Sequence, residues 1–193
     1  MQRAYIEACL IELRALKPGN VHVQSEGHGM TVAQFETSAR VSAAPLCAPG
    51  RPVGARIRDA VAATRAAVGC NTNLGIVLLA APLITAAEHA APGDLQERLA
   101  TTLAGLTVAD AAAVYEAIRI AEPAGLGRVA EQDVAAAPTI GLRQAMALAA
   151  ERDLIARQYA DDYAEVFAIG VQRLAAARRQ GHAAEWSATL AYM

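Results

Sequence analysis

The chain has 193 residues, a length that suits one domain with a substantial buried core. A hydrophobic content of 54% and a mean hydropathy of +0.24 exclude an intrinsically disordered protein. The formal net charge is −2 and no long run of one sign occurs, which excludes a protein that binds nucleic acid through charge alone.

Apolar residues recur at every third or fourth position along most of the chain, and strand-like alternation is rare. Helices are therefore expected over residues 2–16, 31–43, 53–67 and 74–87, from Asp94 and from Thr107, over residues 138–150 and 152–179, and from Ala183. The helix over 152–179 has an alternative, a broken pair near Gly170.

Local signals mark several of these boundaries. Thr31 with Gln34, and Asp94 with Glu97, are capping-box patterns at helix starts. Gly69 is a typical helix end. The fold class predicted is all-α, a single-domain helical bundle of about eight helices over residues 1–193. Because the last helix carries no stop signal, a C-terminal segment is expected to be missing.

The location predicted is the cytoplasm, and no contact with a membrane is expected. Cys9, Cys47 and Cys70 form no CxxC pair and lack the spacing of a zinc site, which favours free thiols in a reducing compartment. Acidic residues near the start argue against a signal peptide. The apolar run over residues 74–87 is too short to span a bilayer and contains Pro82.

Polar loops stand out in a chain made largely of Ala and Leu. The segment KPGNVHVQSEGHG contains Lys17, His22 and His28, and GCNTNLG places three polar residues at the start of the apolar helix. Each has a purely structural alternative, as a helix cap or a loop histidine. Asp153 and Arg157 could likewise form an ordinary surface ion pair at helical spacing.

Taken together, these loops favour a nucleotide site. A helix start offers free N–H groups to phosphate, and a lysine adds a cation. Aspartates could hold Mg²⁺, which prefers oxygen ligands and often bridges to substrate phosphates. The chain has no Walker loop and no GxGxxG motif, so a sheet-based nucleotide fold is not expected.

Three segments, ELRALKPGNVHVQSEGHGM, VGCNTNLGIVLLAAPL and ERDLIARQY, resemble the triphosphoribosyl-dephospho-CoA synthase family. That family has a PKPGLVD loop, a GxHxDM segment and an NTHKG turn before an apolar helix, in this order. The resemblance implies an all-α transferase that moves a triphosphoribosyl group from ATP to dephospho-CoA and releases adenine. Mg²⁺ is expected, and the product would serve prosthetic-group biosynthesis.

The chain departs from the family pattern at three positions. His22 replaces an aspartate, the acid of HxDM is missing after His28, and Leu74 replaces the lysine of NTHKG. The NTNLG form resembles a divergent branch, from archaea and methylotrophic bacteria, linked to tetrahydromethanopterin- or methanofuran-type cofactors. Two alternatives therefore stay open, a transferase with a pterin-like acceptor and a non-catalytic nucleotide-binding subunit.

The site residues follow from the loops and the resemblance. Asp133 and Asp153 are the metal ligands or acid–base groups expected, with His22 and His28 as further catalytic candidates. The nucleotide is expected to contact Lys17, Gly19, Asn20, Asn71, Thr72, Asn73, Gly75 and Arg157. The Ala-rich helix faces would also suit a homodimer.

Overall fold

The computed structural model describes residues 1–17, 30–89, 92–123 and 132–193, and within them the fold is all-α. These residues form ten α-helices and one π-helical segment, η1. The elements are α1 (Gln2–Arg14), α2 (Val32–Leu46), α3 (Val53–Val68), α4 (Leu74–Glu88), α5 (Leu95–Ala104), α6 (Val108–Ala121), α7 (Leu142–Ala147), α8 (Leu154–Ala160), η1 (Val166–Val171), α9 (Gln172–Arg179) and α10 (Ala184–Tyr192).

The helix starts predicted from capping patterns are confirmed. Reciprocal capping boxes begin α2 at Thr31 and α5 at Asp94, and a third begins α6 at Thr107. Gly69 ends α3 in the left-handed conformation, with φ of 74°. Local sequence signals therefore set the starts of α2, α5 and α6 and the end of α3.

The last third differs from the prediction. The helix expected over residues 138–150 is confined to α7, and the long helix over 152–179 is interrupted. The interruption lies at Asp162 and Tyr163, which have φ of 52° and 58°, and not at Gly170, which lies within η1. Two consecutive left-handed residues cannot continue a right-handed helix, so α8 ends before them.

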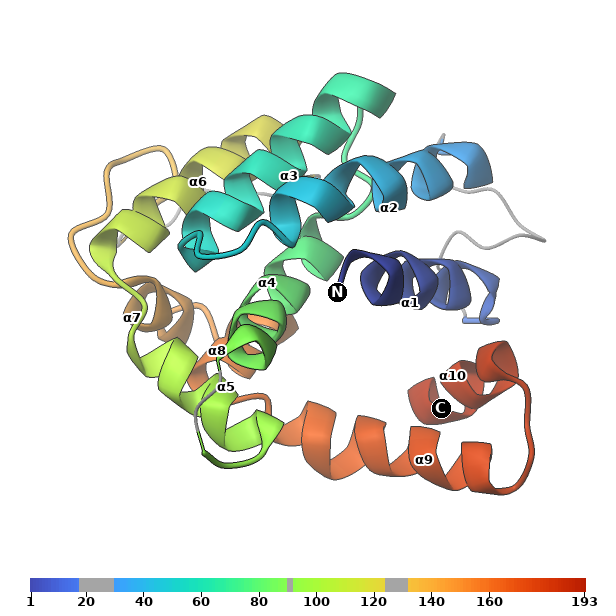
Figure 1. The fold of residues 1–193 in the computed structure, drawn as a ribbon. Coiled ribbons are helices and arrows are strands. Elements are labelled where there is room, and N and C mark those ends of the chain that lie inside the picture. The colour runs from blue at the N-terminus through green and yellow to red at the C-terminus, as the bar shows by residue number, and fades with distance from the viewer. Residues whose placement is uncertain (18–29, 90–91, 124–131) are drawn as a thin grey trace.

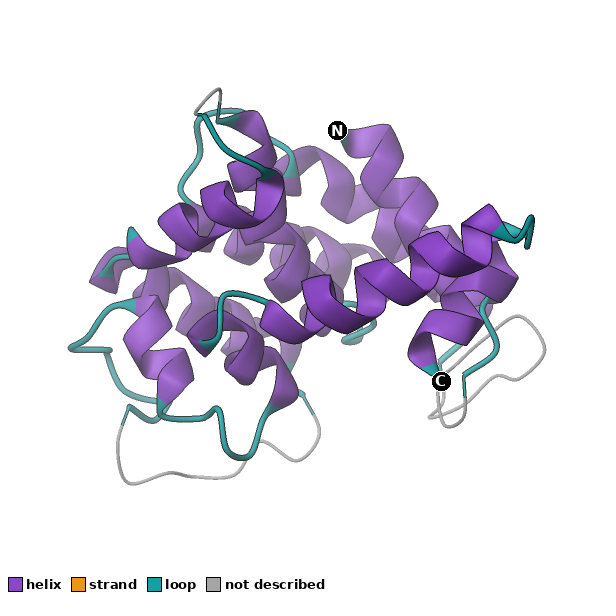
Figure 2. Ribbon diagram, turned by 90° about the horizontal axis from the view of Figure 1, so that it is seen from below, coloured by secondary structure: helices purple, strands orange, loops and turns teal. Residues whose placement is uncertain are grey.

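The helices α2, α3 and α6 lie side by side, and α4 crosses beneath them (Figure 1). The helices α7 and α8 pack together and reach α6 and α4 respectively. The pair α9 and α10 lies at the edge of the molecule, where α10 also contacts α1 (Figure 1). Seen at right angles, the described elements are helices and connecting loops only (Figure 2).

The packing of α3 on α6 depends on a glycine. A Cβ atom on Gly54 would lie 2.5 Å from the main-chain oxygen of Asp110, so only glycine allows this approach. The Gly54 N–H donates to Asp110 Oδ1 at 2.8 Å, while Asp110 Oδ2 accepts from the Thr107 N–H at 2.9 Å. One buried carboxylate thus both caps α6 and holds α3 against it.

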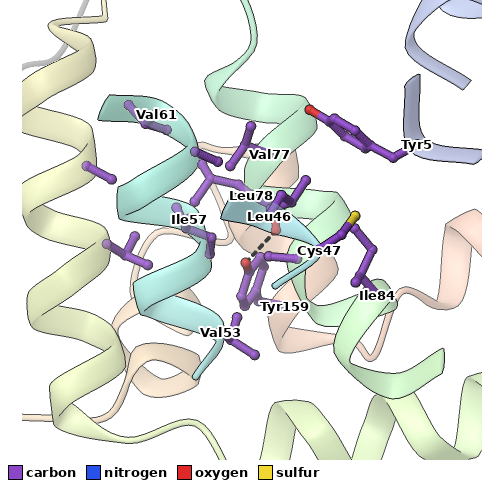
Figure 3. Close-up of a cluster of buried hydrophobic side chains, with 14 of the residues drawn as sticks. Tyr5, Leu46, Cys47, Val53, Ile57, Val61, Val77, Leu78, Ile84 and Tyr159 are labelled. Atoms are coloured by element: carbon purple, nitrogen blue, oxygen red, sulfur yellow. Dashed lines mark hydrogen bonds between the residues drawn. The ribbon is translucent and has the colours of Figure 1, made fainter. Parts of the chain in front are cut away.

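The core surrounds α4, whose internal proline leaves a carbonyl without its usual partner. Pro82 has no N–H to donate to the Leu78 carbonyl one turn earlier. The hydroxyl of Tyr159 donates to that carbonyl at 2.6 Å, as the dashed line in Figure 3 marks. Tyr163 donates to the Leu79 carbonyl at 3.1 Å. The residues of α8 and the turn after it therefore anchor α4.

The described helices include none that is both long and apolar enough to cross a membrane.

Candidate functional site

A cavity of about 660 Å³ opens between α4, α6, α7 and α8. Its volume falls in the range of small-molecule sites, which are mostly apolar with a few placed polar groups. The apolar lining residues described are Leu74, Leu78, Val114, Ile118, Pro123, Val134, Leu142, Ala145, Met146, Leu148, Ala149, Ile155 and Ala156.

Three of the polar residues at this cavity that the sequence predicted come from separate segments. Asn71 comes from the turn before α4, Asp133 from the segment after α6, and Asp153 from the turn between α7 and α8. Gly75 lines the cavity on α4, where a Cβ atom would lie 3.0 Å from Ile155 Cδ1. The fold therefore brings together Asn71, Gly75 and both aspartates predicted from the sequence.

The Asn71-Thr72-Asn73 turn divides its three side chains between two environments. Asn71 Oδ1 accepts the Leu74 N–H at 3.1 Å and the residue borders the cavity. Thr72 and Asn73 are buried on the other side of the turn, against α2. Asn73 is the N-cap residue of α4, yet its side chain caps no helical N–H.

Thr72 and Asn73 belong to a buried hydrogen-bond cluster with Ser38, Ser42 and Tyr5. Ser38 donates to the Gln34 carbonyl at 2.6 Å, so its oxygen accepts the Thr72 hydroxyl at 2.5 Å. Ser42 donates to the Ser38 carbonyl at 2.6 Å and accepts from the Tyr5 hydroxyl at 3.0 Å and from Asn73 Nδ2 at 3.2 Å. Each hydroxyl proton in the cluster has an acceptor.

Burial around this cluster suppresses ionisation. Desolvation raises the pKa of the Tyr5 phenol well above its usual value and raises the pKa of the Cys9 thiol to about 11. Cys9 and Asn73 border a gap of about 10 Å³, room for about one water molecule. Thr72 and Asn73 thus lie in a packed part of the described interior, and their predicted contact with a nucleotide stays a prediction.

The two carboxylates of the cavity also hold local structure. Asp133 Oδ1 accepts the Ala135 N–H at 2.8 Å, and Asp153 Oδ1 accepts the Ala156 N–H at 2.8 Å as the N-cap of α8. No group of three or more His, Cys, Asp or Glu side chains suited to a metal occurs in the described ranges. Mg²⁺ takes oxygen ligands, and Asp133 and Asp153 are the two carboxylates of the described lining.

Two cations predicted to bind the nucleotide lie elsewhere. Lys17 is buried, and its Nζ donates to the Glu12 carbonyl at 2.6 Å and to the Glu12 carboxylate. Arg157 Nη2 donates to the Glu165 carboxylate at 3.0 Å and is not among the cavity residues described. The alternative of an Asp153–Arg157 ion pair is wrong, because Asp153 caps α8 and Arg157 pairs with Glu165.

Three polar residues of the cavity were not predicted as site residues from the sequence. They are Tyr115, Gln132 and Arg152. The Tyr115 hydroxyl donates to the Gln132 carbonyl at 2.8 Å, and burial, with Asp133 nearby, raises the pKa of Tyr115. Arg152 Nη1 donates to the Leu148 carbonyl at 3.1 Å. Arg152 stands next to Asp153 in the chain, and that adjacency is the signal that the sequence offers.

Four predicted site residues, Gly19, Asn20, His22 and His28, lie outside the described residues.

A second cavity, of about 570 Å³, lies between the start of α3, the end of α4, α5 and the start of α6. Arginine side chains at this cavity bind groups of the protein itself. Arg56, 1% exposed, binds the Glu88 carboxylate through both terminal nitrogens at 3.1 and 2.5 Å and the Leu46 carbonyl at 3.1 Å. Arg98 donates to the Ala86 carbonyl at 3.2 Å. These contacts join helix ends and loops.

A family model described as ATP:dephospho-CoA triphosphoribosyl transferase matches residues 1–193, the whole chain. No curated protein matches the chain, and neither does any solved structure.

Proposed function

The chain belongs to the ATP:dephospho-CoA triphosphoribosyl transferase family, and we propose that it carries out this transfer in the cavity between α4, α6, α7 and α8. The enzyme would take the triphosphoribosyl group from ATP, attach it to dephospho-CoA or a closely similar acceptor, and release adenine. The family match over the full chain carries this proposal, and the polar groups that line the cavity support this place for the reaction.

The reaction requires one bond to break and one to form at the ribose. The bond between C1′ and adenine N9 breaks, its electron pair leaves with adenine, and adenine takes up a proton. A hydroxyl oxygen of the acceptor bonds to C1′ and gives up its proton. Positive charge develops on the ribose in between, as in glycoside cleavage.

Asp133 and Asp153 are the described residues best placed for this chemistry. Both line the cavity, so one can protonate the leaving adenine while the other accepts the proton of the attacking hydroxyl. A carboxylate also stabilises positive charge on the ribose. His22 and His28 remain further acid–base candidates, as Gly19 and Asn20 remain candidates for nucleotide binding.

In the alternative role, Asp133 and Asp153 would instead hold Mg²⁺ when the nucleotide binds, and the acid–base steps would fall to His22 and His28. The ion would neutralise phosphate charge and fix the triphosphate, so that binding energy positions the ribose carbon. Asn71 contributes an amide at the same cavity, and Gly75 keeps space beside Ile155. The apolar walls suit a planar base and exclude water.

The test uses the whole protein with ATP, Mg²⁺ and dephospho-CoA. We expect free adenine by chromatography, together with a CoA species heavier by one triphosphoribosyl group in mass spectrometry. Omission of dephospho-CoA should abolish both products. No adenine with any acceptor would contradict the proposal.

A parallel reaction replaces dephospho-CoA with a reduced pterin, because the NTNLG turn departs from the family pattern. We expect dephospho-CoA to be the better acceptor. Adenine release that depends on the pterin alone would move the activity to pterin-type cofactor biosynthesis.

A further inference from the structure

We propose that Arg152 binds the triphosphate of the donor, whereas the sequence predicted Lys17 as the phosphate cation and Arg157 as a further nucleotide contact. This inference rests on the proposed function, since it names a binding group of the same cavity. It concerns the group of the described lining that would face the phosphates.

The described lining of the cavity offers one cationic side chain for a phosphate. The described lining residues include two carboxylates, Asp133 and Asp153, and one cationic side chain, Arg152. A triphosphate beside two carboxylates is strongly repelled unless cations compensate. Mg²⁺ can neutralise the negative charge of the carboxylates. An arginine guanidinium can donate two parallel hydrogen bonds to the oxygens of a phosphate.

The hydrogen bonds of Arg152 leave most of its guanidinium available. Nη1 donates to the Leu148 carbonyl at 3.1 Å, and the side chain is otherwise exposed. Among the ion pairs of the described residues, none includes Arg152. The other two arginines near α7 and α8 form ion pairs, Arg143 with Asp162 at 2.8 Å and Arg157 with Glu165.

The backbone around Arg152 holds it in place. The N–H groups of Arg152 and Asp153 both donate to the Ala149 carbonyl at 3.0 Å, which closes the turn between α7 and α8. The same turn directs Asp153 to cap α8. The cation and one of the two acids are thus presented to the cavity by one compact turn, and the Leu148 bond anchors one nitrogen of the fork.

The test compares Arg152→Met and Arg152→Lys with Arg173→Met, a matched change at an exposed arginine of α9. The probes are inorganic tripolyphosphate, ATP and adenosine, each with Mg²⁺, in isothermal titration. Arg152→Met should lower the affinity for tripolyphosphate and for ATP about tenfold, equivalent to about 1.4 kcal/mol of binding free energy. The affinity for adenosine should not change. Arg152→Lys should recover part of the loss, because it restores charge without the fork.

Unchanged tripolyphosphate affinity in Arg152→Met would overturn the inference, as would the absence of tripolyphosphate binding by the unaltered protein. An equal loss in Arg173→Met would also overturn it. Thermal melting checks that each variant is folded. If Arg152→Met does not fold, the comparison is made with Arg152→Lys alone.

Adenine release separates this inference from the proposed function. If the unaltered protein releases adenine while Arg152→Met keeps the same KM for ATP, the inference fails and the function stands. If no adenine is released but tripolyphosphate binding still depends on Arg152, the function fails and the anion site stands.

Discussion

The two sides of the turn before α4 contrast sharply, although both are polar. On one side Thr72 and Asn73 lie in the buried cluster with Tyr5, where the gap is about 10 Å³. On the other side Asn71 borders a cavity of about 660 Å³, together with Arg152. One side is closed by its own hydrogen bonds, and the other has room for a ligand.

The contrast teaches that polar residues in an apolar chain must be judged by their partners. Asn71 and Asn73 are two positions apart and chemically identical, yet Asn73 bonds to Ser42 inside the core while Asn71 lines a cavity. A buried amide is costly to remove because its partners lose their hydrogen bonds. An amide at a cavity is expected to affect a ligand more than the fold.

The largest effect should come from the carboxylates of the cavity. Asp133→Asn and Asp153→Asn each keep an oxygen that accepts the main-chain N–H, so the turn and the α8 cap persist. Loss of the acid–base group should lower adenine release about 100-fold or more. The measurement is kcat with saturating ATP, and a melting temperature unchanged from the parent protein is the control. A near-normal kcat in both variants would mean that neither aspartate takes part in the reaction.

The buried cluster should respond in stability instead. Asn73→Ala removes the donor to Ser42 and leaves a small void in the packed interior. We expect the free energy of unfolding, from urea denaturation, to fall by about 2 kcal/mol. ATP affinity at concentrations where the variant is folded should stay within about twofold, which is a small free-energy change. A large loss of affinity with normal stability would place Asn73 in the site.

The closed side should also be sensitive to alkaline pH, through Cys9. Its pKa is raised by burial to about 11 from an ordinary value of 9.0, so the unfolded chain loses the proton first. This contribution to stability is complete below pH 9 and is lost as the pH rises to about 11.

Between pH 8 and 10.5 the parent protein should therefore lose about 1–2 kcal/mol more unfolding free energy than Cys9→Ser, in which no thiol titrates at this position. Urea denaturation at the two pH values measures the difference. Equal losses in the two proteins would mean that water reaches Cys9.

The smallest effect expected is at Asn71. The variant Asn71→Asp keeps an oxygen for the Leu74 N–H and adds a negative charge at the cavity. Stability should stay within about 0.5 kcal/mol, as for most exposed changes. ATP should bind about threefold to tenfold more weakly, because the new charge repels phosphate at close range. Titration of ATP gives the affinity, and unchanged binding would leave Asn71 as a cap alone.

The sequence predicted the helices best where the determinant is local. Thr31 and Asp94 cap helices through residues three positions away, and such patterns are visible in one dimension. The break at Asp162 and Tyr163 was missed, because it is set by the contact between Tyr163 and α4 across the fold. No local pattern reports a partner that distant.

The prediction of site residues was likewise limited to what local sequence can show. The sequence identified Asn71 as a polar residue at a helix start and Asp153 as a candidate acid, but it placed Asp153 within a helix that the structure begins at Leu154. It did not separate Arg152 from Arg157, because the choice depends on which face of α8 meets Glu165. Lys17 was expected to be available and is held by Glu12 on the preceding helix. These assignments require the packing of helices, which the pattern alone does not contain.

The most direct test of the account is a crystal structure of Asp133→Asn with ATP and Mg²⁺, because the slowed variant should retain its substrate. We predict that the nucleotide lies in the cavity between α4, α6, α7 and α8, with its phosphates against Arg152 and Asn71. A nucleotide in the second cavity, beside Arg56 and Glu88, would contradict the account.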